Sequence, residues 1–385
     1  MSQSNQPLIV GAGPVGLGAA LFLARNGRIP RIVEIRDNPS QQSKALAVNP
    51  RTLDILEPTG LTRQMLELGL PIHGIRFYRN GQVLAAISLA GIHPKYPYML
   101  ALSQAATDRL LAQGFAAAGG EVERGVKLVE CRSIGEEVEA VLESPADGHR
   151  EVVRCPWLLA ADGAHSIARQ QLAINFVGLS FAEEWHLADA PLRTALAPDY
   201  VHIFLLAGDT FLFLLRVVDD ARRDPTGEPL WRVLANRPEP LSRLVQAEQA
   251  GLPTWTSSFH IAHRIAVSLA AGRVYFAGDA AHIHSPLGAR GMNLGLEDAR
   301  VFAELVQTNR LSDYNRRRRP VDAQVVRRVE LISRIVSPES YCYRFLRAFV
   351  FPMAIKMPFL RARMMGTVTG LDHELPYLTP LQRAN

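Results

Sequence analysis

The feature that most constrains this chain is a glycine-rich turn between two short apolar runs near its start. The runs at Leu8–Val10 and 31–35 have strand character, and the segment between them carries apolar residues at helical spacing as far as Gly27. The turn reads Gly11-Ala12-Gly13-Pro14-Val15-Gly16. A strand, such a turn, a helix and a second strand form a βαβ unit, which typically binds a dinucleotide pyrophosphate at the helix N-terminus. The opening segment therefore predicts a Rossmann-like α/β domain.

An acidic residue supports a nucleotide at this turn. Glu34 stands at the end of the second apolar run, about 20 residues after the first glycine, where such folds use a carboxylate to bind a ribose. The G-x-G-x-x-G pattern is weak by itself, and its alternative is a glycine-rich turn without a ligand. The flanking strand, helix and acid together favour the nucleotide site.

Two later turns also follow apolar strands. The first is Asp162-Gly163, after the apolar run at 157–161, and the second is Gly278-Asp279, after the apolar run at 273–277. Parallel sheets bind ligands at the carboxyl ends of their strands, so an acid at those ends is well placed. After the second turn the chain passes through glycines into a helix that begins near Met292, whose free backbone N–H groups would attract negative charge.

These three turns, in this order, resemble the fingerprints of the class A FAD-dependent aromatic monooxygenase family, the p-hydroxybenzoate hydroxylase type. Residues 43–60 and the helix start at Gln104 are also similar to family segments, and the resemblance extends from residue 8 to about 335. It implies a glutathione-reductase-type FAD domain. It also implies that the following residues bind FAD: Gly11, Gly13, Pro14, Val15, Gly16, Glu34, Lys44, Gln104, Asp162, Gly278, Asp279, Pro286, Gly288, Gly291, Met292 and Asn293.

The resemblance further implies an enzyme, a flavoprotein monooxygenase. In that family NADPH or NADH reduces the flavin, O2 adds at C4a, and the hydroperoxide hydroxylates an aromatic substrate, here a phenolic or polycyclic small molecule. Two alternatives stay open from the residues: an FAD-dependent reductase of an unsaturated lipophilic substrate, and a non-catalytic FAD-binding protein, since a fold alone does not guarantee activity.

The substrate side is expected in a second, mainly antiparallel sheet. Asn80-Gly81 joins two strand-like runs as a hairpin, and 176–190, 200–217 and 254–262 are rich in aromatic and β-branched residues. Phe211, Phe213 and Leu215 would share one sheet face, which is either a lipophilic pocket or ordinary core. The candidate pocket residues are Arg216, Phe213 and Pro286.

The chain is expected to divide into three parts. A discontinuous FAD-binding domain takes residues 1–73, 98–175 and 265–335, with helices expected at Met292 to Leu305 and Ser312 to Val336; 74–97 and 176–264 form the substrate domain; and 336–385 form a C-terminal helical segment. That last segment mixes apolar residues with arginines. It packs as terminal helices or makes peripheral contact with a membrane.

Composition and charge exclude several other functions. The 42 basic and 37 acidic residues are nearly balanced, so we expect no nucleic-acid partner. Cys131, Cys155 and Cys342 lie far apart, which excludes a C-x-x-C redox centre. No secretory signal or membrane span is apparent, which predicts a cytoplasmic protein.

Four histidines could form a metal site and four arginines an anion site, but we expect both groups to have structural roles. His260, His263, His282 and His284 have no cysteine or acidic cluster to complete a metal set, so no metal site is expected. The run of arginines at 316–319 is expected to be a solvated helix face rather than an anion site.

Overall fold

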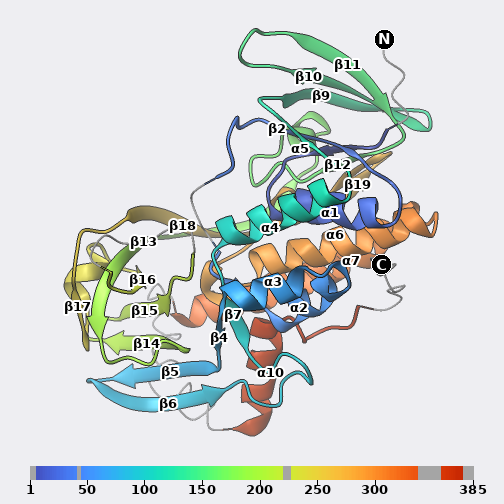
Figure 1. The fold of residues 1–385 in the computed structure, drawn as a ribbon. Helices are drawn as coiled ribbons and strands as arrows, with labels where there is room; N and C mark the ends of the chain where they lie inside the picture. The colour runs from blue at the N-terminus through green and yellow to red at the C-terminus, as the bar shows by residue number, and fades with distance from the viewer. Residues whose placement is uncertain (1–5, 41–44, 220–226, 337–356, 376–385) are drawn as a thin grey trace.

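The computed structural model describes residues 6–40, 45–219, 227–336 and 357–375. Figure 1 shows one large sheet, with β13 (Phe176–Thr194), to the left of a group of helices. Strands β2 (Arg31–Glu34), β12 (Leu158–Ala160) and β19 (Ala270–Ala271) of the other large sheet lie above these helices, and a smaller sheet lies at the top of the view. None of the described helices is long and apolar enough to cross a membrane.

The first sheet has six strands and is parallel except at one edge. Its order is β19 (Ala270–Ala271), β20 (Val274–Phe276), β12 (Leu158–Ala160), β1 (Leu8–Val10), β2 (Arg31–Glu34) and β8 (Val122–Arg124). Only β19 runs antiparallel to its neighbour. Every residue of β1, β12 and β20 is buried, as expected for parallel strands covered on both faces. The carboxyl ends of these three strands are the positions of the three predicted turns.

Helices cover this sheet and hold the turns in place. The helix α1 (Pro14–Arg25) packs against both α4 (Gln104–Ala117) and α6 (Gly291–Gln307). A Cβ at Gly18 would lie 2.6 Å from Cδ2 of Leu296, so α1 and α6 cross closely because α1 carries glycine there. The expected helices at Gln104, at Met292 and after Ser312 are confirmed, the last as α7 (Tyr314–Val336).

The second large sheet is mainly antiparallel, as expected. Its order is β21 (His282–Ile283), β18 (Trp255–Ala266), β13 (Phe176–Thr194), β16 (Leu230–Ala235), β15 (Thr210–Arg216), β14 (Tyr200–Leu206), β5 (Gly74–Arg79) and β6 (Gln82–Ser88), with β17 (Ala247–Gln249) beside β13. The hairpin between β5 and β6 turns through Asn80 and Gly81, both with positive φ, which fits the right-handed twist of its strands. The β5 strand joins the sheet through parallel pairing with β14, across more than a hundred residues of sequence.

Two small sheets and the remaining short elements complete the described fold. One small sheet has β11 (Arg150–Cys155), β10 (Glu137–Glu143) and β9 (Lys127–Ile134), and the other has β3 (Ala47–Val48), β7 (Met99–Ala101) and β4 (Leu70–Ile72). The short helices are α2 (Pro50–Leu56), α3 (Leu61–Leu68), α5 (Ile167–Gln171), η1 (Glu57–Thr59), η2 (Pro240–Arg243), η3 (Gly278–Ala280), η4 (Pro286–Gly288) and η5 (Leu311–Asp313).

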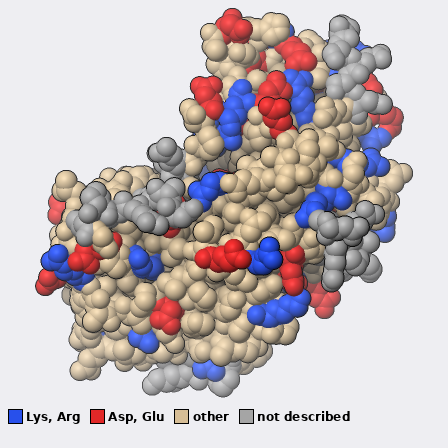
Figure 2. All heavy atoms as spheres, viewed as in Figure 1, with Lys and Arg blue, Asp and Glu red and all other residues tan. Residues whose placement is uncertain are grey.

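The C-terminal segment expected to be helical is described in part. The helix α10 (Pro358–Thr369) packs against α7, and its Met365 joins the apolar core of the antiparallel sheet. Residues 337–356 and 376–385 lie outside the described residues. Basic and acidic side chains are interspersed on the face drawn in Figure 2, so that face presents no extended basic patch.

Candidate functional site

The three predicted turns meet in space, and glycine makes the meeting possible. Gly11 has φ of +100°, and a Cβ there would lie 2.4 Å from the carbonyl oxygen of Ala161, beside Asp162. A Cβ at Gly278 would lie 2.7 Å from Cγ2 of Val15, in the first turn. The first turn therefore packs directly on the other two. A side chain at either glycine would push these backbones apart.

Within the first turn, Gly11 and Gly16 allow close packing of the backbone, and Gly13 borders a space that no atom of the described residues fills. A Cβ at Gly16 would lie 1.9 Å from the carbonyl oxygen of Gly11, which no structure tolerates. A Cβ at Gly13 would meet no protein atom within 4 Å. Gly13 also precedes α1 as its N-cap and offers no side chain to the first free N–H groups. The turn is thus a bare cradle of backbone donors at a helix N-terminus, which fits a phosphate group.

Glu34 clamps this cradle from the next strand. Its Oε2 accepts from the backbone N of Ala12 at 2.8 Å, and its Oε1 accepts from Nε of Arg36 at 2.8 Å. Burial raises the pKa of Glu34, but the bonds from Arg36 and Ala12 outweigh burial and lower the pKa overall. The carboxylate is therefore ionised. Its Oε1 also accepts from the backbone N of Arg36 at 3.2 Å, so Oε2 is the oxygen that retains acceptor capacity for a hydroxyl group.

Asp162 has one oxygen engaged and one free for a ligand. Its Oδ2 accepts from the backbone N of Ile167 at 2.8 Å and so caps α5. Its Oδ1 is buried and has no hydrogen-bond partner among the described residues. Burial raises the pKa of this carboxyl group. A buried acceptor without a donor costs free energy, so its position beside Gly11 fits a ligand that supplies the donor.

The third turn presents a carboxylate and a helix start. Asp279 is exposed at the end of β20, while Gly278 donates its backbone N–H to Oδ2 of Asp298 at 3.0 Å. Gly288 is buried, and Pro286 at the start of η4 is exposed. The helix α6 then begins at Gly291 with no side chain bonded to its first N–H groups. Its N-terminus is open to an anion in the same way as that of α1.

Asn293 has a structural task in addition to its predicted position beside the flavin. Its Oδ1 accepts from the backbone N of Asn49 at 3.0 Å, and its Nδ2 donates to the carbonyl oxygens of Ala47 and Ala289 at 2.9 and 2.7 Å. The side chain is completely buried. The side chain of Asn293 is therefore engaged in holding Asn49, Ala47 and Ala289 together.

The N-terminal half of α4 carries a candidate site residue, Asp108, that the sequence analysis did not predict. Gln104 opens that helix and pairs with Ala45, its N donating to the carbonyl oxygen at 2.9 Å and its Oε1 accepting from the N at 3.3 Å. One turn later, Oδ1 of Asp108 is buried without a hydrogen-bond partner among the described residues, and burial raises the pKa of Asp108 to about 8. The only sequence signal for Asp108 is that it lies four residues after Gln104, which places the two on the same face of the helix. Lys44 lies outside the described residues.

A model of a protein family described as "FAD binding domain" matches residues 5–329. The chain belongs to this family. Its relatives include the 6-methylpretetramide 4-monooxygenase of Streptomyces rimosus, 34% identical over 306 residues, with 76% of this chain and 54% of that protein covered. Another is the pentachlorophenol 4-monooxygenase of Sphingobium chlorophenolicum, 28% identical over 303 residues, with 76% and 56% covered. The chain spans just over half the length of these curated relatives.

Solved structures of the same fold extend the comparison. The p-nitrophenol 4-monooxygenase PnpA of Pseudomonas putida DLL-E4 superposes with a TM-score of 0.81 at 22% identity, covering 96% of this chain and 99% of that one. The anhydrotetracycline hydroxylase OxyS of Streptomyces rimosus superposes with a TM-score of 0.78 at 25% identity, covering 96% and 77%. The predicted resemblance to the class A aromatic hydroxylase family of FAD-binding proteins is therefore confirmed.

In this family member an apolar sheet face adjoins the third turn. Phe211 and Leu215 are buried in one apolar cluster with Phe213 partly buried against it, so the three share a face as expected. Leu287 and Ala289, which flank Gly288, pack on the same cluster. Arg216 follows on the opposite face by alternation and donates to the carbonyl oxygen of Leu230 at 2.8 Å. Phe213, Leu287 and Ala289 thus border the same apolar cluster, while Arg216 does not share the face that carries Phe213.

Two sequence expectations fail beneath the third turn. Arg318 is not on a solvated face: its side chain is 2% exposed, and it bonds Asp298 and Asp322 at 2.7 Å each. The expectation that no acidic cluster accompanies the histidines is also wrong, because His282, Asp298 and Asp322 offer ligand atoms within 4.8 Å of one another. Arg318 already binds both carboxylates, so the cluster is a network of buried ion pairs.

This network gives His282 a positive charge. Its Nε2 lies 2.8 Å from Oδ2 of Asp298. Burial lowers the pKa of His282, but Asp298 and Asp322 outweigh burial and raise it to about 9. Burial raises the pKa of Asp322 to about 7, against the opposing effect of Arg318. Asp298 also accepts from Gly278, so the network fixes the backbone from which Asp279 projects.

Proposed function

We propose that the chain is an FAD-dependent monooxygenase that uses NAD(P)H and O2 to hydroxylate a phenolic or polycyclic aromatic small molecule. The observation that carries this proposal is the convergence of three turns, two of which end in the open N-termini of α1 and α6. One long ligand that carries an anionic pyrophosphate in its middle and a ring that becomes negatively charged on reduction at one end would satisfy both helix starts. We infer that the parallel sheet is a Rossmann-like, glutathione-reductase-type FAD fold.

The chain's own residues divide the binding of FAD among them. The backbone around Gly13 would hold the pyrophosphate, and Glu34 would accept from the adenosine ribose. The exposed carboxylate of Asp279 would accept from the ribityl chain, and the N–H groups of Gly291 and Met292 would face the ring. The unpartnered Oδ1 of Asp162 fits a donor on the same ligand. When bound, FAD supplies hydride acceptance and O2 activation, which no side chain provides.

The electrostatics of α6 suit that chemistry. Its first N–H groups carry the positive end of a helix dipole, which favours negative charge on the ring during reduction. Asp298, which Arg318 holds in a buried ion pair, accepts from the backbone N of Gly278 and so fixes the third turn. Preorganised donors of this kind stabilise charge without having to reorient as the charge develops.

The apolar face beside η4 supports an aromatic substrate. Phe213, Leu287 and Ala289 border one apolar cluster. Such a surface binds a ring by burial and excludes water from the ring. Relatives of the chain are named as monooxygenases of a chlorinated phenol and of pretetramide and tetracycline compounds, which is the substrate class that this face suits.

An isotope experiment tests the proposed function. FAD-loaded protein is mixed with phenols and polycyclic phenols under ¹⁸O2, and both NADPH and NADH consumption and product mass are followed. We expect one compound class to accelerate NAD(P)H oxidation and to yield a product that contains one labelled oxygen. A product that gains two hydrogens and no oxygen would instead identify a reductase. FAD-loaded protein that consumes no NAD(P)H with any compound would identify a non-catalytic flavin-binding protein.

A further inference from the structure

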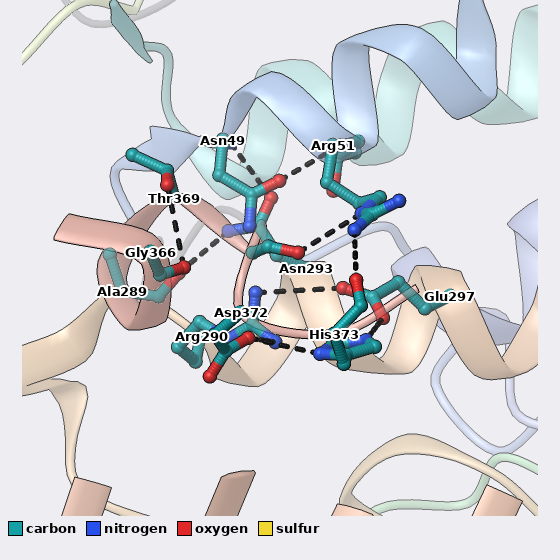
Figure 3. A network of polar contacts seen from close by, with 12 residues as sticks. Asn49, Arg51, Ala289, Arg290, Asn293, Glu297, Gly366, Thr369, Asp372 and His373 are labelled. Carbon is teal, nitrogen blue, oxygen red and sulfur yellow. Dashed lines mark hydrogen bonds and ion pairs between the residues drawn. The ribbon is translucent and has the colours of Figure 1, made fainter. Parts of the chain in front are cut away.

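The segment that follows α10, residues 370–375, lies across the starts of α2 and α6 and against α7, and we call it the C-terminal strap (Figure 3). Arg51 of α2 donates to the carbonyl oxygens of Gly370, at 3.0 Å, and of His373. Arg328 of α7 donates to the carbonyl oxygen of Asp372 at 3.0 Å and to its carboxylate at 2.6 Å. One short segment therefore joins α2 and α7, which are distant in sequence.

The strap also places a histidine between two carboxylates under α6. Nε2 of His373 lies 2.6 Å from Oε2 of Glu297, and its Nδ1 lies 2.9 Å from Oδ1 of Asp372. Carboxylates only accept, so both ring nitrogens donate and the ring is an imidazolium. Burial lowers the pKa of His373, but the two carboxylate bonds outweigh burial and raise it. His373 therefore joins the strap to the second turn of α6 by a charge-assisted bond.

The residue just before α6 depends on the same carboxylates. Arg290 is completely buried, and its three guanidinium nitrogens have no hydrogen-bond partner among the described residues. Its nearest opposite charges are Glu297, with Nη1 at 3.5 Å from Oε1, and Asp372, with Nη2 at 3.7 Å from Oδ1. A buried cation without hydrogen bonds is costly, so the position of this guanidinium is set by those two carboxylates.

Gly370 brings the strap into direct contact with this region. It has φ of +81°, and a Cβ there would lie 2.4 Å from Nη1 of Arg290 and 2.7 Å from Nδ2 of Asn49. Asn49 in turn donates its backbone N–H to Asn293. The strap therefore packs closely on Arg290 and on Asn49, which in turn bonds Asn293. These two residues bracket Gly291 and Met292, the backbone predicted to face the flavin ring.

We propose that Asp372 and His373 are positioning residues, which hold the first turn of α6 in the geometry that binds the flavin ring. Both residues act through other side chains, because their ion pairs and hydrogen bonds join them to Arg290, Arg328 and Glu297. Asp372 balances Arg290, and His373 anchors Glu297 one turn further along the helix. The proposal rests on the proposed function, because it assigns the start of α6 to the flavin.

The test compares strap variants in FAD-depleted and reloaded protein. The variants are His373→Ala, Asp372→Asn and, as matched control, Glu374→Gln, whose side chain is exposed in the same strap. The dissociation constant for FAD is measured by flavin fluorescence, amide exchange of residues 289–295 is measured without FAD, and stability is measured in urea. We expect His373→Ala and Asp372→Asn to raise the dissociation constant about tenfold and to speed exchange at the start of α6. Glu374→Gln should change neither.

A further variant and the flavin potential separate positioning from mere stability. His373→Gln keeps one donor for Glu297 and should recover part of the FAD affinity that His373→Ala loses. The reduction potential of bound flavin should shift in His373→Ala and stay unchanged in Glu374→Gln. Lower stability with unchanged FAD affinity and unchanged potential would overturn the proposal. If the unaltered chain binds no FAD, the proposed function fails, and unchanged exchange at 289–295 would then overturn the strap's role independently.

Discussion

The substitution Gly13→Ala isolates the phosphate cradle from the packing of the fold. A Cβ at this position meets no protein atom within 4 Å, and the φ of −77° is accessible to any residue. The added methyl therefore enters only the space in front of the turn. If that space belongs to the FAD pyrophosphate, the variant should fold normally and bind FAD poorly.

The expected magnitude follows from close packing. Forcing one methyl into a filled site costs roughly 1–3 kcal/mol, which is about a 5- to 150-fold rise in the dissociation constant. For the apoprotein, alanine restricts the unfolded chain, which stabilises by about 0.4–1 kcal/mol. Alanine is also a poorer N-cap than glycine, by roughly a few tenths of a kcal/mol to 1 kcal/mol. These effects oppose each other, so the free energy of unfolding should stay within about 1 kcal/mol of the original.

Gly16→Ala is the matched comparison three residues later. Its Cβ would lie 1.9 Å from a backbone oxygen of Gly11, and that atom cannot move without displacing β1 from the turn. This variant should lose stability as apoprotein, by about 3 kcal/mol or more. Urea unfolding of both apoproteins and titration with FAD, followed by fluorescence quenching, separate the two effects. Undiminished FAD affinity in Gly13→Ala would refute the assignment of the turn to the pyrophosphate.

Three further predictions concern the third turn and the network beneath it. Asp279→Ala should purify without flavin, and a variant that stays yellow with normal flavin content would contradict the ribityl assignment. Arg318→Met removes the guanidinium that bonds both Asp298 and Asp322 and leaves His282 as the cation beside them, and urea unfolding should show a loss of about 3–5 kcal/mol; an unchanged midpoint would show that the ion pairs of Arg318 are not needed. The pKa of His282 is raised to about 9 from an ordinary 6.5. Its protonation therefore stabilises the fold fully below pH 6.5, and this stabilisation, up to roughly 3 kcal/mol, is lost as pH rises through 9. His282→Gln should therefore show a smaller fall in stability between pH 6.5 and 9.5 than the unaltered protein, measured by urea unfolding at each pH.

Local sequence signals predicted most of the elements around the site. The strand, glycine turn and helix at the start, the helix at Gln104 and the Asn80-Gly81 hairpin all depend on residues that are neighbours in sequence. The order of the three turns also predicted their meeting, because carboxyl ends of parallel strands share one edge of a sheet. The assignment of individual residues to FAD remains a prediction.

The errors concern charged residues whose partners are remote in sequence. Arg318 stands in a run of four arginines, and sequence alone favours a solvated face for such a run. The helix α7 turns only this one of them toward Asp298, a residue of α6. The partner of His282, Asp298, lies 16 residues later in α6, and no local pattern connects the two.

Glycine spacing and the alternation of apolar residues determined by themselves where this chain forms a βαβ unit, where its second sheet lies and which family it belongs to, since those patterns act over a few residues at a time. The tertiary structure alone decided which charges are buried together and that Asp372 and His373 reach the start of α6. The pattern of apolar residues in a sequence indicates only that one face of an element is buried. An ion pair depends on which side chain, remote in the sequence, packs against that face.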